Sequence, residues 1–504
     1  MEPGELERLF PSRFVSFAFP NPQPGDPYAD LLRVAVLDSP LRASTSPPCI
    51  AAMLVPFGRE DDWIFSTVAG HLQLLLSSSS SENFPISRLI LVGDLPSSSS
   101  PKHYSRPRSD PDSDRLRRFQ QRLMPLLFAL SPKASFCRDL PDIPFLSFED
   151  DVLRVTPVEK LVGAAAGEML VEDVELDRSP SAPPELRRRL RFKRMPNLVQ
   201  SQVRLVSDSS TFSSRGSLRP EAGSLVQPYL KPMLAGLSLI APDLGRQVRS
   251  GLMPRALCIG VGGGALLMSL RLKFGFHVLG IEADDAVLNV AKRHFGFQED
   301  DSLKVGLGEG LACIKFLSTS KTGKTFDPNH DKTDREPMAL LRGYSSGFDA
   351  IMVDLDSEDA GNGFFAPPLE FVESSTLMAV RTILKEHGVL VVNVIPPSIS
   401  FYEEMIESFH KIFAELYELD VGNGENYVLV ATVSPIIIAE SKSEDSFFKM
   451  LEEVVGETYA NDALLAGKCN LAYSGFGALV VRSNPLTQTN PAKYFLDKGI
   501  FESE

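Results

Sequence analysis

The sequence feature that most constrains this chain is a glycine-rich turn placed directly after a short apolar strand. Residues 256–259 (ALCI) are followed by the turn 260–264 (GVGGG), and a helical pattern begins directly after it. Glycine adopts positive φ easily and lets the backbone come close to a ligand. The first N–H groups of the next helix have no partner within that helix and face the same space. The turn therefore predicts a ligand site at the start of this helix.

The segments around this turn predict an α/β fold. Strand-like segments at 256–262, 277–283, 302–310, 348–356, 389–395, 426–433 and 477–483 alternate with helix-like segments at 264–274, 286–295, 311–317, 368–385 and 401–417. Such alternation is typical of a parallel sheet with helices on both faces. We therefore expect a Rossmann-like domain, preceded by a smaller α+β domain.

The chain is expected to have four parts. These are an α+β domain over 1–207, a polar linker over 208–224, the Rossmann-like domain over 225–483 and a C-terminal tail over 484–504. Polar, serine-rich segments predict disordered loops near 77–83 and 97–113, because such residues bury too little apolar surface to offset the entropy of ordering. The first domain shows no catalytic constellation, so we expect it to act as a scaffold or to dock the substrate.

An arginine-rich stretch, residues 185–206, lies near the end of the first domain. It is either a patch for RNA or an acidic partner, or a solvated face of alternating strand residues, and we favour the solvated face. The formal net charge of −14 argues against an extended nucleic-acid-binding surface, which would need clustered basic residues. The acidic balance suits a basic protein partner.

The cysteines and the N-terminus bear on metal binding and on the cellular location of the protein. The five cysteines are far apart, with no C-x-x-C pair and no histidine at ligand spacing, so we expect no metal site. The acidic N-terminus has no apolar signal-peptide core, and no uncharged run reaches the length of a membrane span. These features predict a cytoplasmic protein without a membrane partner, with the nucleus as the alternative location, and they leave the oligomeric state open.

Acidic residues follow the second and third strands after the turn. Glu282 lies 22 residues after Gly260, where a carboxylate can accept hydrogen bonds from ribose hydroxyls. Glu309, followed by Gly310, ends the next strand, beside the expected place of an adenine. The alternative for Glu282 is an exposed neighbour of a helix cap. For Glu309 it is capping of the helix that begins near Gly310.

Two aspartates follow the fourth strand. Asp354 and Asp356 lie at its carboxyl end, where ligands bind in open α/β sheets. Carboxylates at this place can hold an amine or accept its proton, so we predict that Asp354 and Asp356 are catalytic. The alternative for Asp356 is a turn or helix-capping role. Phe364 and Phe365 follow, and they either shelter a cationic amine or, as we favour, pack under the loop.

Acids at three successive strand ends favour S-adenosylmethionine over a dinucleotide as the cofactor. A dinucleotide site would more often show the spacing G-x-G-x-x-G, whereas this turn reads G-x-G-G-G. The predicted cofactor-binding residues are Gly260, Gly262, Gly263, Gly264, Glu282, Glu309, Gly310 and Asp354.

Several segments resemble the methyltransferase-like protein 13 family, which comprises the elongation factor 1-alpha lysine and N-terminal methyltransferases. The likeness rests on 260–270 (GVGGGALLMSL), 280–297 (GIEADDAVLNVAKRHFGF), 306–314 (GLGEGLACI) and 348–372 (FDAIMVDLDSEDAGNGFFAPPLEFV). It extends over roughly residues 30–480. The resemblance implies a class I S-adenosylmethionine-dependent methyltransferase that modifies an amine of a protein such as elongation factor 1-alpha. It also implies that the glycines of the turn, Glu282 and Glu309 contact the cofactor and that Asp354 lines the site.

Full-length members of this family carry a further N-terminal methyltransferase domain, to which the resemblance assigns lysine methylation. This chain shows no second glycine-rich turn followed by an acidic strand end, so we expect that domain to be absent. The resemblance then favours an α-amino group as the acceptor, with lysine as the other choice.

Two other functions remain as alternatives. The same fold resembles spermidine synthase, an aminopropyltransferase that binds a diamine through an acidic D-x-x-D strand end. Here Ser357 replaces the second acid, which counts against that reaction. The other alternative is a non-catalytic adaptor with this fold, because Cys258 stands near the place where many methyltransferases have an acid.

Overall fold

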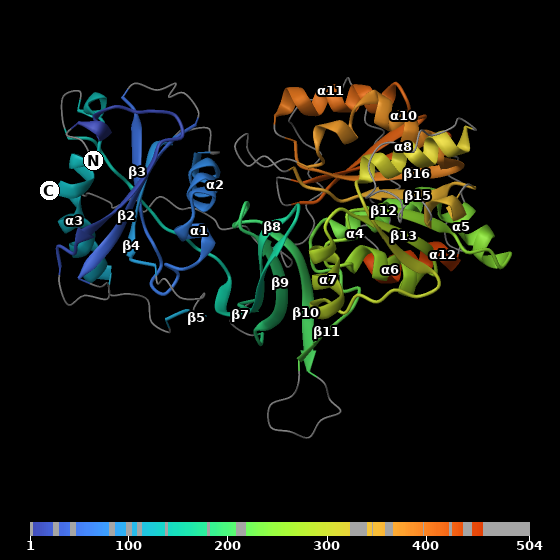
Figure 1. The fold of residues 1–504 in the computed structure, drawn as a ribbon, viewed down its shortest axis with the longest axis horizontal. Helices are drawn as coiled ribbons and strands as arrows, with labels where there is room; N and C mark the ends of the chain where they lie inside the picture. Colours follow the sequence, from blue (N-terminus) through green and yellow to red (C-terminus); the bar gives the residue numbers. More distant parts are fainter. Residues whose placement is uncertain are drawn as a thin grey trace.

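The computed structural model describes residues 4–23, 30–40, 47–79, 86–96, 103–107, 113–136, 140–178, 182–207, 218–322, 340–344, 346–357, 366–396, 398–422, 426–436 and 446–456. The strands of these residues form three sheets. Figure 1 shows the five-stranded sheet at one end of the molecule, the seven-stranded sheet at the other, and a six-stranded sheet between them.

The five-stranded sheet has the order β1-β2-β4-β3-β6 and pairs β3 with β4 and β6 in parallel. Its strands are β1 (Phe14–Pro20), β2 (Leu31–Asp38), β3 (Cys49–Leu54), β4 (Ile86–Asp94) and β6 (Phe145–Leu146). Helices α1 (Trp63–Ser66) and α2 (Val68–Ser79) pack on one face, and α3 (Ser113–Ala129) packs on the other. Short 3-10 helices span Glu5–Glu7 and Lys133–Ser135.

The six-stranded sheet, here called the middle sheet, is antiparallel throughout, in the order β11-β10-β9-β8-β7-β5. Its strands are β5 (Tyr104–Ser105), β7 (Val152–Gly163), β8 (Gly167–Leu176), β9 (Glu185–Phe192), β10 (Val199–Ser207) and β11 (Leu218–Pro220). Alternate residues such as Met169, Val171 and Leu190 form one apolar cluster with Val287 and Val290 of the next unit. The middle sheet is therefore packed onto the seven-stranded unit by a shared core.

The seven-stranded sheet has the order β14-β13-β12-β15-β16-β18-β17. Its strands are β12 (Arg255–Ile259), β13 (His277–Glu282), β14 (Leu303–Leu307), β15 (Phe348–Val353), β16 (Leu384–Val394), β17 (Glu415–Asp420) and β18 (Tyr427–Thr432). The first five pair in parallel, and β18 runs antiparallel to both neighbours. The predicted Rossmann-like α/β fold is confirmed.

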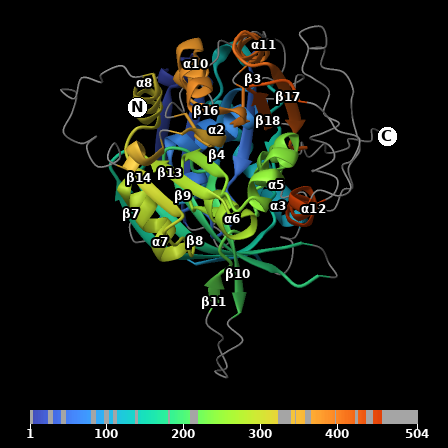
Figure 2. The same cartoon turned by 90° about the vertical axis from the view of Figure 1, so that its right-hand side faces the viewer.

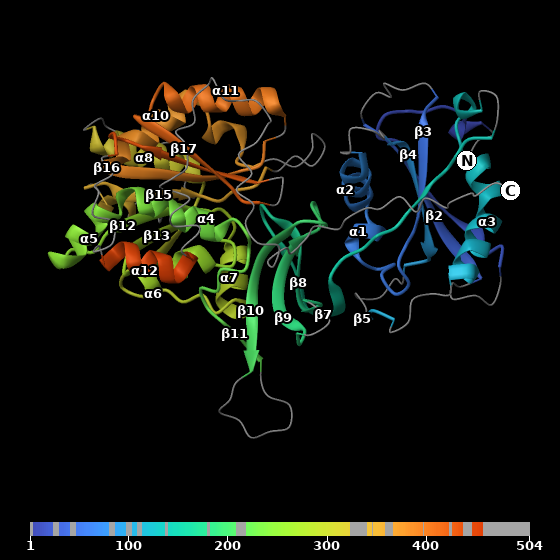
Figure 3. The same cartoon turned by 180° about the vertical axis from the view of Figure 1, so that it is seen from behind.

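Helices cover both faces of this sheet, as Figures 2 and 3 show from two further sides. One apolar cluster joins the sheet to α4 (Leu230–Ala235), α5 (Ala241–Arg249), α6 (Ala265–Phe274) and α12 (Ser446–Val455), and a second joins it to α8 (Gly310–Lys321), α10 (Ser374–Ile383) and α11 (Ile399–His410). Helix α7 (Asp285–His294) lies towards the middle sheet. Successive side chains of β12 point to opposite faces of the sheet, and so they contribute to both clusters. Cys258 faces the first cluster, whereas Leu257 and Ile259 face the second.

Short 3-10 helices complete this unit at Gly236–Ile240, Arg342–Tyr344 and Leu369–Phe371. In the part of the chain that the structure describes, no helix is long and apolar enough to cross a bilayer. The same residues contain no cluster of potential metal ligands.

Three predictions of local structure differ from the fold. The helix predicted over 401–417 ends at His410, and residues 415–420 form β17 instead, where Leu416 and Leu419 are buried. Residues 218–220 of the predicted linker are a strand that pairs with β10. Residues 77–79 of the first predicted loop belong to α2, and 104–105 of the second form β5. The strand predicted at 477–483, the tail 484–504, Phe364 and Phe365 lie outside the described residues.

The arginine-rich stretch is not a solvated face, contrary to the favoured interpretation. Arg187, Arg189 and Arg191 of β9 are at most 8% exposed. Glu172 of β8 accepts hydrogen bonds from Arg189 and Arg191 at 2.6 Å, and Asp62 pairs with Arg191 at 2.9 Å. A guanidinium can be buried when carboxylates pair with it. Arg191 therefore joins the middle sheet to Asp62, the residue that caps α1, whereas Arg187 and Arg189 pair within the middle sheet.

Candidate functional site

Three glycines with positive φ shape the turn between β12 and α6. Gly260, Gly262 and Gly264 have φ values of 89°, 52° and 80°, which residues with a Cβ rarely adopt. A Cβ on Gly260 would lie 2.2 Å from the carbonyl oxygen of Asp354, and one on Gly264 would lie 2.3 Å from the Phe297 ring. The glycines thus let the turn pack closely between the end of β15 and the segment after α7.

Gly263, the remaining glycine of the turn, contacts the middle sheet. The N–H of Gly263 donates a hydrogen bond to the Ser201 hydroxyl oxygen at 2.7 Å. A Cβ on Gly263 would lie 2.9 Å from the Phe295 ring and 3.1 Å from the Ser201 Cβ. Ser201 belongs to β10 and is 5% exposed, so this contact positions the turn from outside its own domain.

A cavity of about 850 Å³ opens at this turn, within the range of roughly 300–1,000 Å³ usual for small-molecule sites. It lies at the carboxyl edge of the seven-stranded sheet, where the strand order reverses between β12 and β15. All the residues predicted for the site line it, namely Gly260, Gly262, Gly263, Gly264, Glu282, Glu309, Gly310, Asp354 and Asp356. The cavity also extends along the middle sheet to Arg59 and Asp150.

Glu282 is turned towards the glycine turn. Its carboxylate accepts hydrogen bonds from the N–H groups of Val261 at 3.1 Å, Gly262 at 3.4 Å and Asp284 at 3.1 Å. Burial raises the pKa of Glu282, and these backbone hydrogen bonds oppose the rise. Asp284 is the residue that caps α7, through Ala286 N–H at 2.9 Å. Glu282 is therefore part of the cavity floor and not an exposed neighbour of the cap.

Glu309 stands at the first position before α8, but its side chain makes no capping hydrogen bond. The side chain is exposed and lines the cavity. Gly310, the next residue, brings the backbone close to β12, because a Cβ there would lie 2.5 Å from Ile259 Cγ2. The geometry thus leaves Glu309 available to a ligand.

Asp354 is the most unusual charged group of the cavity. Asn393 of β16 donates a hydrogen bond to it at 3.1 Å, the Tyr229 hydroxyl donates another, and Asn426 holds Asn393 at 3.0 Å. Burial raises the pKa of Asp354 to about 6, helped by the nearby Asp356 charge and opposed by the two hydrogen bonds. Within the described part of the chain, no cationic side chain forms an ion pair with Asp354.

Asp356 lies in a different environment, although it is only two residues further on. Its carboxylate forms an ion pair with Arg194 at 3.1 Å and accepts a hydrogen bond from Gln200 at 3.1 Å. Arg194 also donates to the carbonyl oxygen of Ser357 at 3.0 Å. The strand has ended at Val353, so the two aspartates do not share one sheet face. Asp356 is thus engaged by the middle sheet.

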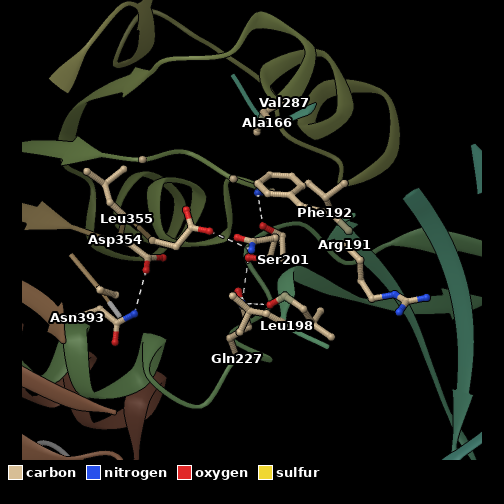
Figure 4. A pocket seen from close by; sticks show the side chains of 18 of the residues that line it. Ala166, Arg191, Phe192, Leu198, Ser201, Gln227, Val287, Asp354, Leu355 and Asn393 are labelled. Atoms are coloured by element: carbon tan, nitrogen blue, oxygen red, sulfur yellow. Dashed lines mark hydrogen bonds between the residues drawn. The ribbon is translucent and has the colours of Figure 1, made fainter. Parts of the chain in front are cut away.

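A second contact fixes the middle sheet beside Glu282. Asp284 accepts hydrogen bonds at 2.8 Å from the N–H groups of both Ala165 and Ala166, in the turn between β7 and β8. Figure 4 shows the other side of the cavity, where Ser201, Gln227, Asp354 and Asn393 surround one space and Arg191 lies at its far end. The middle sheet therefore forms a wall of the cavity.

Several residues of this cavity were not predicted from the sequence. Tyr229 and Asn393 reach Asp354 from segments that are far from it in the chain, and Asn426 in turn donates a hydrogen bond to Asn393. Ser201 and Arg194 come from the middle sheet. A polar Asn393 inside the otherwise apolar strand 389–394 was a signal that could have drawn attention, since buried polar groups need partners.

Comparison with known proteins shows what this chain is similar to. No protein-family model matches the chain. It is 27% identical over 420 residues to the eEF1A lysine and N-terminal methyltransferase of Xenopus laevis, covering 78% of this chain and 52% of that protein. The resemblance predicted from the motifs is thus confirmed, and the chain spans about half the length of the curated relatives it matches.

Two further proteins are similar over a smaller part of the chain. The polyamine aminopropyltransferase of Vibrio vulnificus (strain CMCP6) is 27% identical over 203 residues, which cover 40% of this chain and 54% of that protein. A crystal structure of human methyltransferase-like protein 13 in complex with SAH has 24% sequence identity and a TM-score of 0.35, and covers 51% of this chain and 97% of that one.

Proposed function

We propose that this protein transfers a methyl group from S-adenosylmethionine to an amine of a protein substrate. The observation that carries the proposal is Asp354, a largely buried carboxylate with neutral hydrogen-bond donors, placed directly beside the glycine turn. Such a group can accept a hydrogen bond or a proton from an amine that enters the cavity. The similarity to eEF1A lysine and N-terminal methyltransferases supports the same activity.

The residues of the cavity fit S-adenosylmethionine. Glu282 uses its two oxygens for three backbone N–H groups, and an ionised carboxylate has about four acceptor sites, so one remains for a ribose hydroxyl. Glu309 and Gly310 would lie beside the adenine, and the glycine turn would face the amino-acid end. When bound, the cofactor supplies a methyl group on a positively charged sulfur.

Asp354 prepares the amine for attack in this mechanism. The amine must be neutral to act as a nucleophile, and its ordinary pKa is near 8 for an α-amino group and near 10.4 for lysine. This difference makes deprotonation of lysine roughly 3.4 kcal/mol more costly at neutral pH. A carboxylate with a pKa of about 6 is a better match to an α-amino group than an ordinary aspartate. Tyr229 and Asn393 hold that carboxylate in place.

The substrate follows from the named relatives. Because those relatives are named for eEF1A, we propose elongation factor 1-alpha as the protein to test first, with its α-amino group ahead of lysine. A cytoplasmic location for the activity is part of the same proposal, because an elongation factor acts where translation takes place.

Aminopropyl transfer is the second candidate, because part of the chain is similar to a polyamine aminopropyltransferase. A diamine would need two carboxylates that lack protein partners. Asp356 is paired with Arg194, and Ser357 stands where a further acid would be needed. These contacts favour methyl transfer.

Labelled cofactor tests the proposed function directly. Purified protein is incubated with S-adenosylmethionine carrying a labelled methyl group and a cell extract, and the labelled protein and residue are identified by mass spectrometry. We expect one labelled amine, and we expect purified elongation factor 1-alpha to be labelled in a separate reaction. A parallel reaction with decarboxylated S-adenosylmethionine and 1,4-diaminobutane should yield no product.

Asp354→Asn is the matched control, since it keeps the size and the acceptor oxygen of the side chain. Label that appears equally with this variant would come from a contaminating enzyme or would remove Asp354 from the mechanism. Absence of both labelling and measurable affinity for S-adenosylhomocysteine would contradict the proposed function.

A further inference from the structure

The two aspartates of the cavity differ in what already surrounds them. Asp354 has only neutral donors among the described residues, whereas Asp356 carries the Arg194 guanidinium against both of its oxygens, at 3.1 and 3.3 Å. Gln200 adds a hydrogen bond to Asp356 at 3.1 Å. The first carboxylate is therefore free to bind a cation, and the second is already neutralised.

Arg194 is firmly held in its position. It donates to the carbonyl oxygen of Ser357 at 3.0 Å, and its guanidinium lies over the Phe192 ring at 5.0 Å from the centroid. Its side chain is 24% exposed and that of Asp356 is 21% exposed. An ion pair that is largely withdrawn from water costs considerably more to break than a surface pair, since each charge would remain poorly solvated.

The position of Arg194 determines the charge that the cavity accepts. A single amine beside Asp354 meets one carboxylate, with Arg194 satisfied by Asp356. A second positive charge a few ångströms further along would need Asp356 and would approach the guanidinium instead. Like charges brought together at a recognition site discriminate against the wrong ligand.

We infer that Arg194 is a specificity-determining residue, which occupies Asp356 and so restricts the acceptor site to one amine while excluding diamines. The inference rests on the proposed function, because it concerns the acceptor side of the same site. It assigns Asp356 a role in selecting the substrate, as the partner of Arg194, in place of the catalytic role predicted from the sequence.

Calorimetric binding of two small amines tests this inference. The probes are 1,4-diaminobutane and butylamine, titrated into protein with and without S-adenosylhomocysteine, because their affinity ratio isolates the second positive charge. For Arg194→Gln, which keeps a polar side chain with N–H donors but is shorter and loses the charge, we expect the diamine to bind at least tenfold more tightly than to the unmodified protein. Butylamine should bind the two proteins within about threefold of each other.

Further variants separate this role from a merely structural one. Arg194→Lys keeps the positive charge and should continue to exclude the diamine. Asp356→Asn added to Arg194→Gln should abolish the increase in diamine affinity, since that increase requires the released Asp356 carboxylate. Arg204→Ala removes a more exposed arginine of β10 that pairs with Glu185 and Glu221, and it should leave the amine ratio unchanged.

The results distinguish this inference from the proposed function. Affinity for S-adenosylhomocysteine reports on the cofactor site, and its absence in every protein would contradict the proposed function whatever the amines do. An unmodified protein that binds the diamine as tightly as Arg194→Gln does, or a folded Arg194→Gln that gains nothing, would overturn the role of Arg194. If Arg194→Gln fails to fold, Gln200→Ala, which removes the other donor to Asp356, is measured with the same probes and should leave the diamine excluded.

Discussion

Asp354 is the residue whose environment departs most from that of a surface aspartate. It lies at the end of β15, Tyr229 and Asn393 donate hydrogen bonds to it, and burial raises its pKa to about 6. Burial of a carboxylate that lacks a cationic partner destabilises the folded protein whenever the group is ionised. Ionised Asp354 therefore lowers the stability of the folded protein, and the same carboxylate can accept a proton near neutral pH.

Asp354→Asn should slow methyl transfer by at least about 100-fold, in line with the usual contribution of a proton acceptor, while affinity for S-adenosylhomocysteine changes less than about threefold. The same variant should be more stable than the unmodified protein by about 1–2 kcal/mol at pH 8, because no ionised group is buried. Single-turnover labelling measures the rate of methyl transfer, and thermal unfolding measures the change in stability. Unchanged turnover would remove Asp354 from the mechanism.

The pKa of Asp354 also predicts a pH dependence. Its folded-state value, about 6, exceeds the ordinary 3.8, so the ionised form that accepts the amine proton accumulates as pH rises through about 6. Turnover at saturating substrate should increase between pH 5 and pH 7, and the stability difference from Asp354→Asn should vanish below about pH 4. A turnover profile that is flat between pH 5 and pH 7 would show that ionisation of Asp354 is not required.

At the scale of single elements, β10 contributes to a turn that lies outside its own sheet. Ser201 accepts the hydrogen bond of Gly263 N–H, across 62 positions in the sequence. Ser201→Ala leaves this half-buried N–H without its acceptor, and loss of such a hydrogen bond costs about 0.5–1.5 kcal/mol. We expect affinity for S-adenosylhomocysteine to fall about tenfold, measured by calorimetry.

Ser131→Ala is the control for this change, because it removes a buried hydroxyl that donates to Leu127 in the five-stranded unit. It should alter the melting temperature without altering the affinity. Equal losses of affinity in the two variants would mean that Ser201 acts only through general stability.

The elements that the sequence predicted well are those governed by local patterns. Strand–turn–helix periodicity and the glycine spacing located β12, β13, β15 and the turn, and the acids at strand ends located the cavity. Partners that are distant in the chain were not predictable in this way. Arg191 alternates along β9 like a solvated residue, and its burial is tolerable because Asp62, 129 positions away, Glu172 and the carbonyl oxygen of Pro196 all accept its hydrogen bonds. Helix 401–417 failed at its C-terminal end because apolar residues at 412–416 suit a strand as well as a helix.

At the scale of the whole molecule, a charged joint connects the five-stranded unit to the middle sheet. Arg59 is 3% exposed, pairs with Asp62 and Asp150, and lies among the rings of Phe65, Tyr104 and Phe148. Glu172 and Arg191 continue the joint into β8 and β9. Burial alone would raise the pKa of Glu172, but Arg189 and Arg191 lower it.

Glu172→Gln should therefore destabilise the protein by about 3–5 kcal/mol, since it removes the carboxylate that pairs with buried Arg189 and leaves Arg191 with Asp62 as its remaining charged partner. Because the folded-state pKa of Glu172 is lowered, the stability it contributes is present at neutral pH and is lost as pH falls below the ordinary pKa of a glutamate. Asp173→Asn, in a more exposed pair with Arg188 on the same strands, should cost less than about 1 kcal/mol. Similar denaturation midpoints for the two variants would contradict the importance of the joint.

The apolar interface between α7 and the middle sheet determines where the chain can be truncated. A fragment that begins near residue 225 would keep the seven-stranded sheet but would expose Val287, Val290 and Phe295 to water. The residues that cover them lie on β8, β9 and β10. It would also lose the Ser201 hydroxyl that accepts the hydrogen bond of Gly263 N–H. Such a fragment should aggregate, so the middle sheet and the seven-stranded unit need to be expressed together.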